Sequence, residues 1–183
     1  MKKQVLRLDL DDSASDFDGY AFMLFHTLEP GYAFVDDLNR LYGYALTRIE
    51  DLQLHETLWP LYTYDNTLER MRLFLVEKPA AERMMPRWGA GQKLLIARGD
   101  DARECLERVY NDFLSSPATP QPGNLAAQRR FDILSQFQQN FTTVTLLDPD
   151  APPPQAPKAV RERNETRQLL LAILDYLDIH RLG

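Results

Sequence analysis

The residues best suited to chemistry are five aspartates near the start of the chain: Asp9, Asp11, Asp12, Asp16 and Asp18. They lie between two apolar runs, in the stretch VLRLDLDDSASDFDGYAFMLF. Paired carboxylates can hold a hard cation such as Mg²⁺, and one of them can attack phosphorus. The same residue types are also typical of a solvated turn between two strands. The choice between these interpretations decides whether the protein is an enzyme.

The enzymatic interpretation combines two places in the sequence. Residues 5–13 resemble the first motif of the haloacid-dehalogenase-like phosphotransferases, which implies Asp9 as nucleophile and Asp11 as general acid. Residues 94–101, LLIARGDD, resemble their last motif, in which acidic residues after a strand hold magnesium. That fold needs a parallel sheet whose first strand is buried on both faces, whereas charged residues alternate with leucines in the first run. A magnesium-dependent phosphotransferase is therefore the alternative function.

A calcium site is the other chemistry that the acidic opening suggests. Asp9, Asp11 and Ser13 match the start of an EF-hand loop, but Ala14 stands where glycine is required and Tyr20 where the bidentate glutamate belongs. We therefore interpret the five aspartates as the polar connection between two strands.

The histidines and the cysteine favour structural roles. His26, His55 and His180 are far apart and belong to no HExxH or HxH pattern. His26 ends an apolar run, which predicts a hydrogen-bonded structural histidine. Cys105 lies in a predicted helix and reads as a small core residue. One cysteine excludes an internal disulfide and a cysteine-rich metal site. We assign no metal-binding residue and no cofactor, and the sequence leaves open whether the aspartates between Asp9 and Asp18 bind a cation.

Five aromatic residues in the middle of the chain are Trp59, Tyr62, Tyr64, Phe74 and Trp88. Large aromatic side chains are usually buried, so a core position is the expectation. The alternative is a small-ligand-binding module, with an open pocket lined by Trp59, Tyr62 or Trp88.

Length and charge restrict the protein class. The 183 residues suit one domain with a sizeable core. A net charge of −6 without a dense basic stripe argues against nucleic acid and against an anionic membrane surface. The opening MKKQVLRLDLDD lacks the apolar run of a signal peptide, and no window has the length of a membrane span. We predict a cytoplasmic protein.

Periodicity predicts an α+β fold with a mainly antiparallel sheet of about five to six strands, helices on one face and an extra C-terminal helix. The expected strands are 5–10, 20–25, 58–64, 70–76, 93–97 and 142–147. The expected helices are 29–42 with Gly43 as its stop, a helix that Asp100 and Asp101 cap and that runs through Leu114, 125–139 and 160–180. Hairpins are expected to join the first two strands and the next two. The domain division is 1–149 for the α+β domain, 150–157 for a Pro-rich linker and 158–183 for the C-terminal helix.

Several stretches together resemble the small bacterial family of IPExxxVDY proteins. They are LDLDDSASDFDGYAFMLF, GYAFVDDLNRLYGYALTRIEDLQL, MMPRWGAGQKLLIARGD and FTTVTLLDPD, and they span most of residues 5–150. Residues 141–149 stand where the family has its naming motif and share Asp148 and the apolar character with it. The resemblance implies no established activity and no catalytic residue, and it favours a non-catalytic role.

The sequence as a whole predicts a non-catalytic protein that acts through protein contacts, with a second copy or another protein as partner. The expected contact residues form an apolar stripe on the last helix: Leu170, Ile173, Leu174 and Leu177. Such a stripe has to be buried somewhere, either on a partner or within its own chain.

Overall fold

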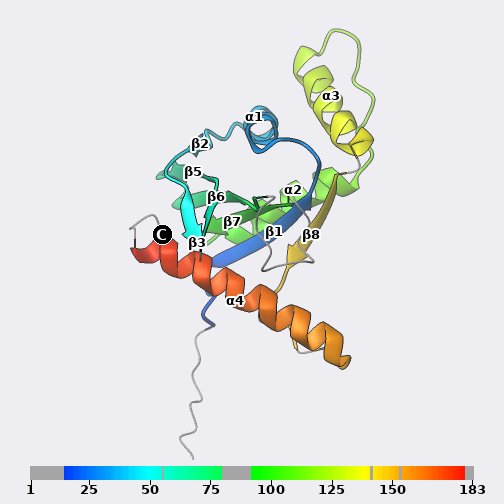
Figure 1. Ribbon diagram of the computed structural model, residues 1–183. Helices are drawn as coiled ribbons and strands as arrows, with labels where there is room; N and C mark the ends of the chain where they lie inside the picture. Colours follow the sequence, from blue (N-terminus) through cyan, green and yellow to red (C-terminus); the bar gives the residue numbers. More distant parts are fainter. Residues whose placement is uncertain (1–14, 55, 80–91, 141, 153, 180–183) are drawn as a thin grey trace, which may run out of the picture.

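The computed structural model describes residues 15–54, 56–79, 92–140, 142–152 and 154–179. They form a six-stranded antiparallel sheet in the order β2-β5-β6-β7-β1-β8, a two-stranded sheet of β3 and β4, and helices on both faces of the large sheet (Figure 1). The large sheet contains β1 (Tyr20–His26), β2 (Thr47–Arg48), β5 (Leu61–Asn66), β6 (Met71–Glu77), β7 (Gln92–Arg98) and β8 (Thr143–Leu147). The small sheet contains β3 (Leu52–Leu54) and β4 (Thr57–Trp59). The helices are α1 (Gly31–Tyr42), α2 (Ala102–Leu114), α3 (Leu125–Gln139) and α4 (Pro157–Ile179). The predicted α+β class is confirmed.

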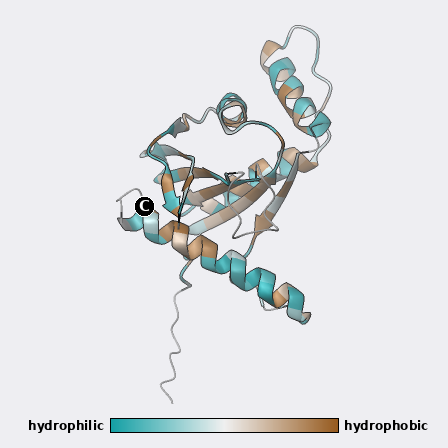
Figure 2. Ribbon diagram, in the orientation of Figure 1, coloured by the Kyte–Doolittle hydropathy of each residue, from teal (hydrophilic) through white to brown (hydrophobic). Residues whose placement is uncertain are grey.

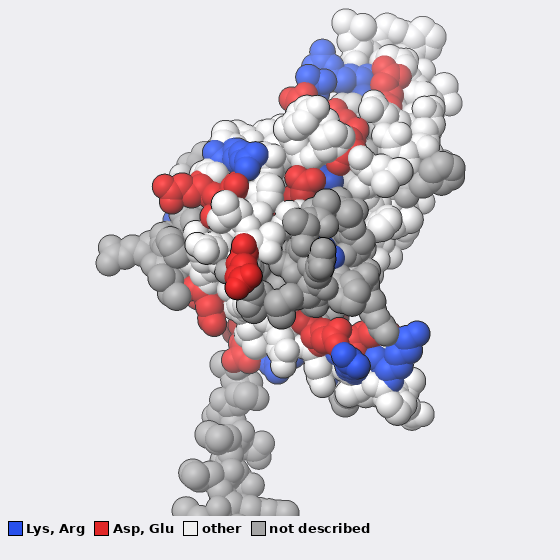
Figure 3. Space-filling model, viewed as in Figure 1, with Lys and Arg blue, Asp and Glu red and all other residues white. Residues whose placement is uncertain are grey.

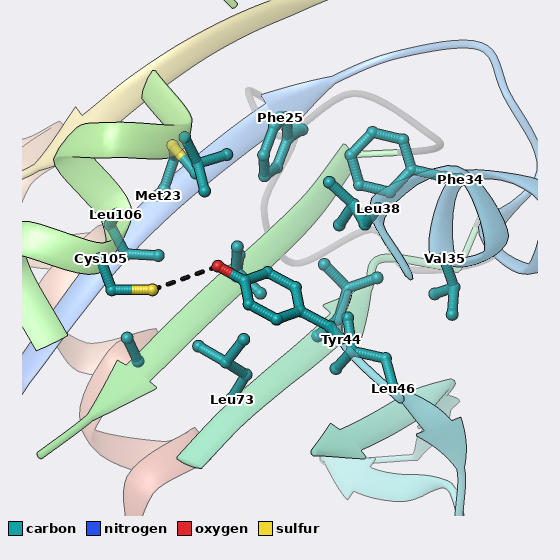
Figure 4. Close-up of a cluster of buried hydrophobic side chains, with 14 of the residues drawn as sticks. Met23, Phe25, Phe34, Val35, Leu38, Tyr44, Leu46, Leu73, Cys105 and Leu106 are labelled. Carbon is teal, nitrogen blue, oxygen red and sulfur yellow. Dashed lines mark hydrogen bonds between the residues drawn. The ribbon is translucent and has the colours of Figure 1, made fainter. Parts of the chain in front are cut away.

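One face of the large sheet is covered by α1, α2 and α3. Alternate residues of the strands, among them Met23, Leu73 and Leu95, meet the apolar sides of these helices. Figure 4 shows the ring of Tyr44 inside this first core, with its hydroxyl 3.3 Å from the Sγ atom of Cys105. Cys105 is therefore a core residue, as predicted.

The opposite face of the sheet is covered by α4 and the β3–β4 hairpin. Phe22, Phe74 and Ile96 point to this side and form a second core with Trp59. Only the C-terminal half of α4 contributes buried residues to it, and Figure 2 shows that the N-terminal half of the helix is largely hydrophilic. The extra C-terminal helix thus covers the sheet face that the other helices leave open.

The local sequence patterns predicted most helices and strands correctly. The first predicted helix ends at Gly43, whose φ of 68° is the left-handed conformation that glycine adopts without strain. The predicted strand 58–64 is wrong in one respect, because Pro60 divides it between β4 in the small sheet and β5 in the large one. Proline has no N–H for a continuous ladder, which explains the break. The short strands β2 and β3 were not predicted.

The predicted hairpin between 5–10 and 20–25 is wrong. β1 pairs with β7 along its whole length and with β8 from Phe22 to His26, so both of its edges are taken along most of its length. The strand predicted at 5–10 itself lies outside the described residues. In the part of the chain that the structure describes, no helix is long and apolar enough to cross a membrane.

Candidate functional site: the open edge of the sheet

The direction of the hydrogen bonds in β1 determines which backbone groups of β8 form hydrogen bonds with β1. In an antiparallel ladder each residue directs its N–H and C=O to the same neighbour, and the direction alternates along the strand. The N–H of Gly99 donates to the carbonyl of Gly19 at 3.0 Å, in continuation of the β1–β7 ladder. Odd-numbered residues of β1 therefore bond to β7. Even-numbered residues such as Phe22 bond to β8, where Phe22 lies opposite Leu147.

Two residues of β8, Val144 and Leu146, form no backbone hydrogen bonds in this ladder. Their N–H and C=O groups point away from β1, at the outer edge of the sheet. Among the described residues, no hydrogen bond from another segment reaches these groups. The preceding outward amide, that of Thr142, donates to the carbonyl of Phe137 at the end of α3, at 3.0 Å. We call the two donors and two acceptors of Val144 and Leu146 the β8 edge.

The side chains of β8 do not protect this edge. The strand reads TVTLL and holds no charge and no proline, the two residue kinds that commonly block edge-to-edge pairing. Thr143 and Thr145 are exposed, whereas Val144 and Leu146 are half-buried and pack against the first core. The edge is thus packed against the first core, and no other described strand covers its outer side.

A small cavity lies where the edge ends. β1 extends beyond β8 by Tyr20 and Ala21, which pair with β7 alone, and a cavity of about 170 Å³ occupies this step. Its lining includes charged side chains that bond to neighbours: Arg103 Nε lies 2.9 Å from Glu107 Oε1, and Ser15 Oγ donates to the carboxylate of Asp150. The cavity therefore adjoins the end of the strand edge, with Leu146 and Leu147 in its wall.

A buried ion pair lies elsewhere, where β7 meets the start of α1. Lys93 is completely buried (0% exposed), and its Nζ donates to the Glu29 carbonyl at 2.7 Å and lies 3.4 Å from Glu77 Oε1. Burial lowers the pKa of Lys93, and the Glu77 carboxylate opposes that shift. Burial raises the pKa of Glu29, the charge of Asp37 raises it further, and Lys93 opposes both. An ammonium enclosed in this way ties the β1–α1 connection to the sheet.

The same polar cluster anchors the start of β8. Gln136 Nε2 donates to Glu29 Oε1 at 3.3 Å, and Thr142 Oγ1 bonds to Thr27 Oγ1 at 3.0 Å. His26 Nδ1 lies 3.0 Å from Gln92 Nε2, so the prediction of a hydrogen-bonded histidine is confirmed. These contacts place the first residue of β8 firmly beside β1.

The acidic residues of the phosphotransferase alternative are not brought together in the described residues. Asp9 and Asp11 lie outside them, as do His55 and His180. Asp100 lies in the turn after β7, directly before the first turn of α2. The described strands pair antiparallel throughout, whereas that family needs a parallel sheet. Within the described residues, no group of three or more His, Cys, Asp or Glu could hold a metal ion.

The aromatic residues of the ligand-binding alternative are core residues where the structure describes them. Trp59 is 2% exposed in the second core, and Tyr62 is 6% exposed in the first. Trp88 lies outside the described residues. An open pocket lined by Trp59 or Tyr62 is therefore not what this fold builds.

The predicted contact stripe on the last helix is buried within its own chain. Leu170, Ile173 and Leu177 are 0% exposed and Leu174 is 4% exposed, all in the second core. Of the two outcomes that the sequence left open, the structure shows burial in the same chain. The stripe then needs no partner to cover it.

The β8 edge is the feature that sequence reasoning missed. Residues 142–147 are predicted as a strand, but nothing local distinguishes an edge strand from a central one, apart from the lack of charge and proline.

On the face shown in Figure 3, acidic and basic side chains lie interspersed. No model of a known protein family matches this chain, and no curated protein matches it either.

Proposed function

We propose that this chain is a non-catalytic cytoplasmic protein that acts through protein contacts, and that the main contact is strand addition at the β8 edge. The observation that carries the proposal is the pair of outward residues Val144 and Leu146, whose two donors and two acceptors have no partner in the part of the chain that the structure describes. An extended segment laid along such an edge gains main-chain hydrogen bonds, and the side chains beside it supply specificity.

The groups able to do covalent chemistry support the non-catalytic part of the proposal. Lys93 is enclosed and hydrogen-bonded, and burial raises the pKa of the Cys105 thiol, which disfavours the reactive thiolate. The single cysteine agrees with a reducing compartment. The resemblance to the IPExxxVDY proteins points to the same kind of role and stays a prediction.

A photo-crosslinking experiment tests the proposal. A benzophenone amino acid replaces Thr145 of β8 in one version of the full chain and Thr47 of β2 in another. Both threonines are exposed and lie in the two outermost strands, so each is a matched control for the other. Irradiation of producing cells should yield a defined adduct of higher mass from position 145 and none from position 47. Equal adducts from both positions, or none from position 145, would contradict the proposal.

A further inference from the structure

We propose that the occupant of the β8 edge is a second copy of this chain, paired antiparallel about a two-fold axis that passes between the two Thr145 residues. This inference rests on the proposed function and names its partner. It follows from the positions of the outward backbone groups, which a symmetric partner can match completely in one register.

The register follows from simple counting. In an antiparallel pair the numbers of opposing residues have a constant sum, so Thr145 opposite itself places Val144 opposite Leu146 of the second copy. Both residues direct their N–H and C=O outward, so each of these pairs exchanges two hydrogen bonds. All outward groups of Val144 and Leu146 in both copies are then satisfied.

The neighbouring symmetric registers match less well. An axis at Val144 would set Leu146 opposite Thr142 of the second copy, whose N–H already donates to the carbonyl of Phe137. An axis at Leu146 would set Val144 opposite Asp148, whose carbonyl already accepts from Ala151. Only the axis at Thr145 uses groups that have no other partner among the described residues.

The side chains near the two-fold axis also favour self-pairing, because the two Thr145 residues lie opposite each other without hydrogen bonds between their backbones. Residues opposite each other without hydrogen bonds have the closest side chains in an antiparallel pair, and paired threonines are favourable there. A strand that meets itself brings any charge near the axis close to an identical charge, and TVTLL contains none. At the end of the pair, Asp148 would face Thr142 of the second copy, so like charges do not meet there either. The pairing joins the two six-stranded sheets into one continuous sheet.

Charge-swapped variants of the full chain test both the partner and the register. Sedimentation velocity of the wild-type chain should show a species with twice the mass of the 21.2 kDa monomer. Thr145→Lys and Thr145→Glu each place like charges opposite one another and should raise the dimer dissociation constant about tenfold or more. An equimolar mixture of the two variants should restore the dimer, because lysine then faces glutamate.

The matched control is the pair Thr143→Lys and Thr143→Glu. Thr143 is exposed on the same face, but in this register it lies opposite Leu147 of the second copy, so mixing these variants should restore nothing. Circular dichroism melts at low protein concentration confirm that each variant is folded, and exposed positions make that the expected result.

Three outcomes would overturn the inference: a wild-type chain that stays monomeric at millimolar concentration, a dimer indifferent to Thr145→Lys, or restoration by the Thr143 mixture. Its failure is distinguishable from failure of the proposed function. A monomeric chain whose position 145 still crosslinks to a different protein in cells would remove the second copy and retain strand addition.

Discussion

The two edges of the large sheet are built differently, and the contact proposed at β8 rests on that difference. One edge is β2, which has two residues and ends in Arg48, whose side chain pairs with Asp51 at 2.7 Å. The other is β8, which has five uncharged residues. Short length and charge are common ways to prevent edge-to-edge pairing, and only β2 has them.

A side chain covers the backbone groups directly before β2. The N–H of Ile49 donates to the carbonyl of Leu61 in β5 at 3.0 Å. Because the direction alternates along a strand, Leu46 and Arg48 direct their backbone groups away from β5. Asn39 of α1 occupies those of Leu46: its Oδ1 accepts from the Leu46 N–H at 2.9 Å, and its Nδ2 donates to the Leu46 carbonyl at 3.1 Å. A side-chain amide thus takes the place of a neighbouring strand at Leu46. Within the described residues, only Arg48 of β2 has outward backbone groups without such cover, whereas β8 has both Val144 and Leu146.

Proline scanning of β8 should give the largest effect. Thr145→Pro removes an N–H that bonds to β1 and should lower the free energy of unfolding by about 2–4 kcal/mol. Val144→Pro removes an outward N–H that bonds to nothing in the described chain, so its cost should be smaller by about 1 kcal/mol or more. Urea denaturation at low protein concentration, where association contributes little, measures both.

Equal losses from these two proline variants would mean that the Val144 amide is also hydrogen-bonded in the monomer. The edge would then be closed, and the contrast between β2 and β8 would disappear. The Val144→Pro variant should also fail to self-associate, which sedimentation velocity can check.

Removal of the amide that covers Leu46, directly before β2, should have the next largest effect. Asn39→Ala leaves the N–H and C=O of Leu46 without partners, and Leu46 is only 3% exposed, so water replaces them poorly. We expect the free energy of unfolding to fall by about 2–3 kcal/mol in urea denaturation. Asn111→Ala, an exposed asparagine in α2, is the control and should change it by less than about 0.5 kcal/mol. Similar effects of both variants would argue against a specific role of Asn39 in covering Leu46.

The smallest expected effect concerns the anchor of β8. Burial raises the pKa of Glu29 above its ordinary value of 4.5, so the folded chain holds this proton more tightly than the unfolded chain. Stability from this group is therefore present below pH 4.5 and is lost as the pH rises through the raised folded value. Glu29→Gln cannot titrate, so its stability should fall less between pH 4.5 and pH 7 than that of the wild type.

Urea denaturation at several pH values between 4 and 7 gives this comparison directly. Glu50→Gln, at an exposed position, should keep the wild-type pH dependence. An unchanged slope in Glu29→Gln would show that the carboxyl near Gln136 is not what makes the anchor of β8 sensitive to pH.

Local pattern predicted the elements well wherever one residue or a short run decides the conformation. α3 begins and ends where the sequence predicted, because a Pro-rich loop precedes Leu125 and β-branched residues follow Gln139. The same reasoning failed for the pairing of the first strands, because alternation shows that a strand has two faces but not which strand lies beside it. Asn39 and Lys93 were missed for a similar reason, since each acts on residues distant in the sequence.

The sequence by itself determined the α+β class, the antiparallel character, most element boundaries and the need to bury the stripe on the last helix. Only the tertiary structure decided the order of the strands, the burial of Leu170 and Ile173 within their own chain, and the position of β8 at an edge. Hydrophobic periods of 2 and 3.6 residues are local properties that neighbouring side chains reveal. The outward direction of the Val144 and Leu146 backbone groups depends on the register with β1, more than a hundred residues away, and therefore emerges only on folding.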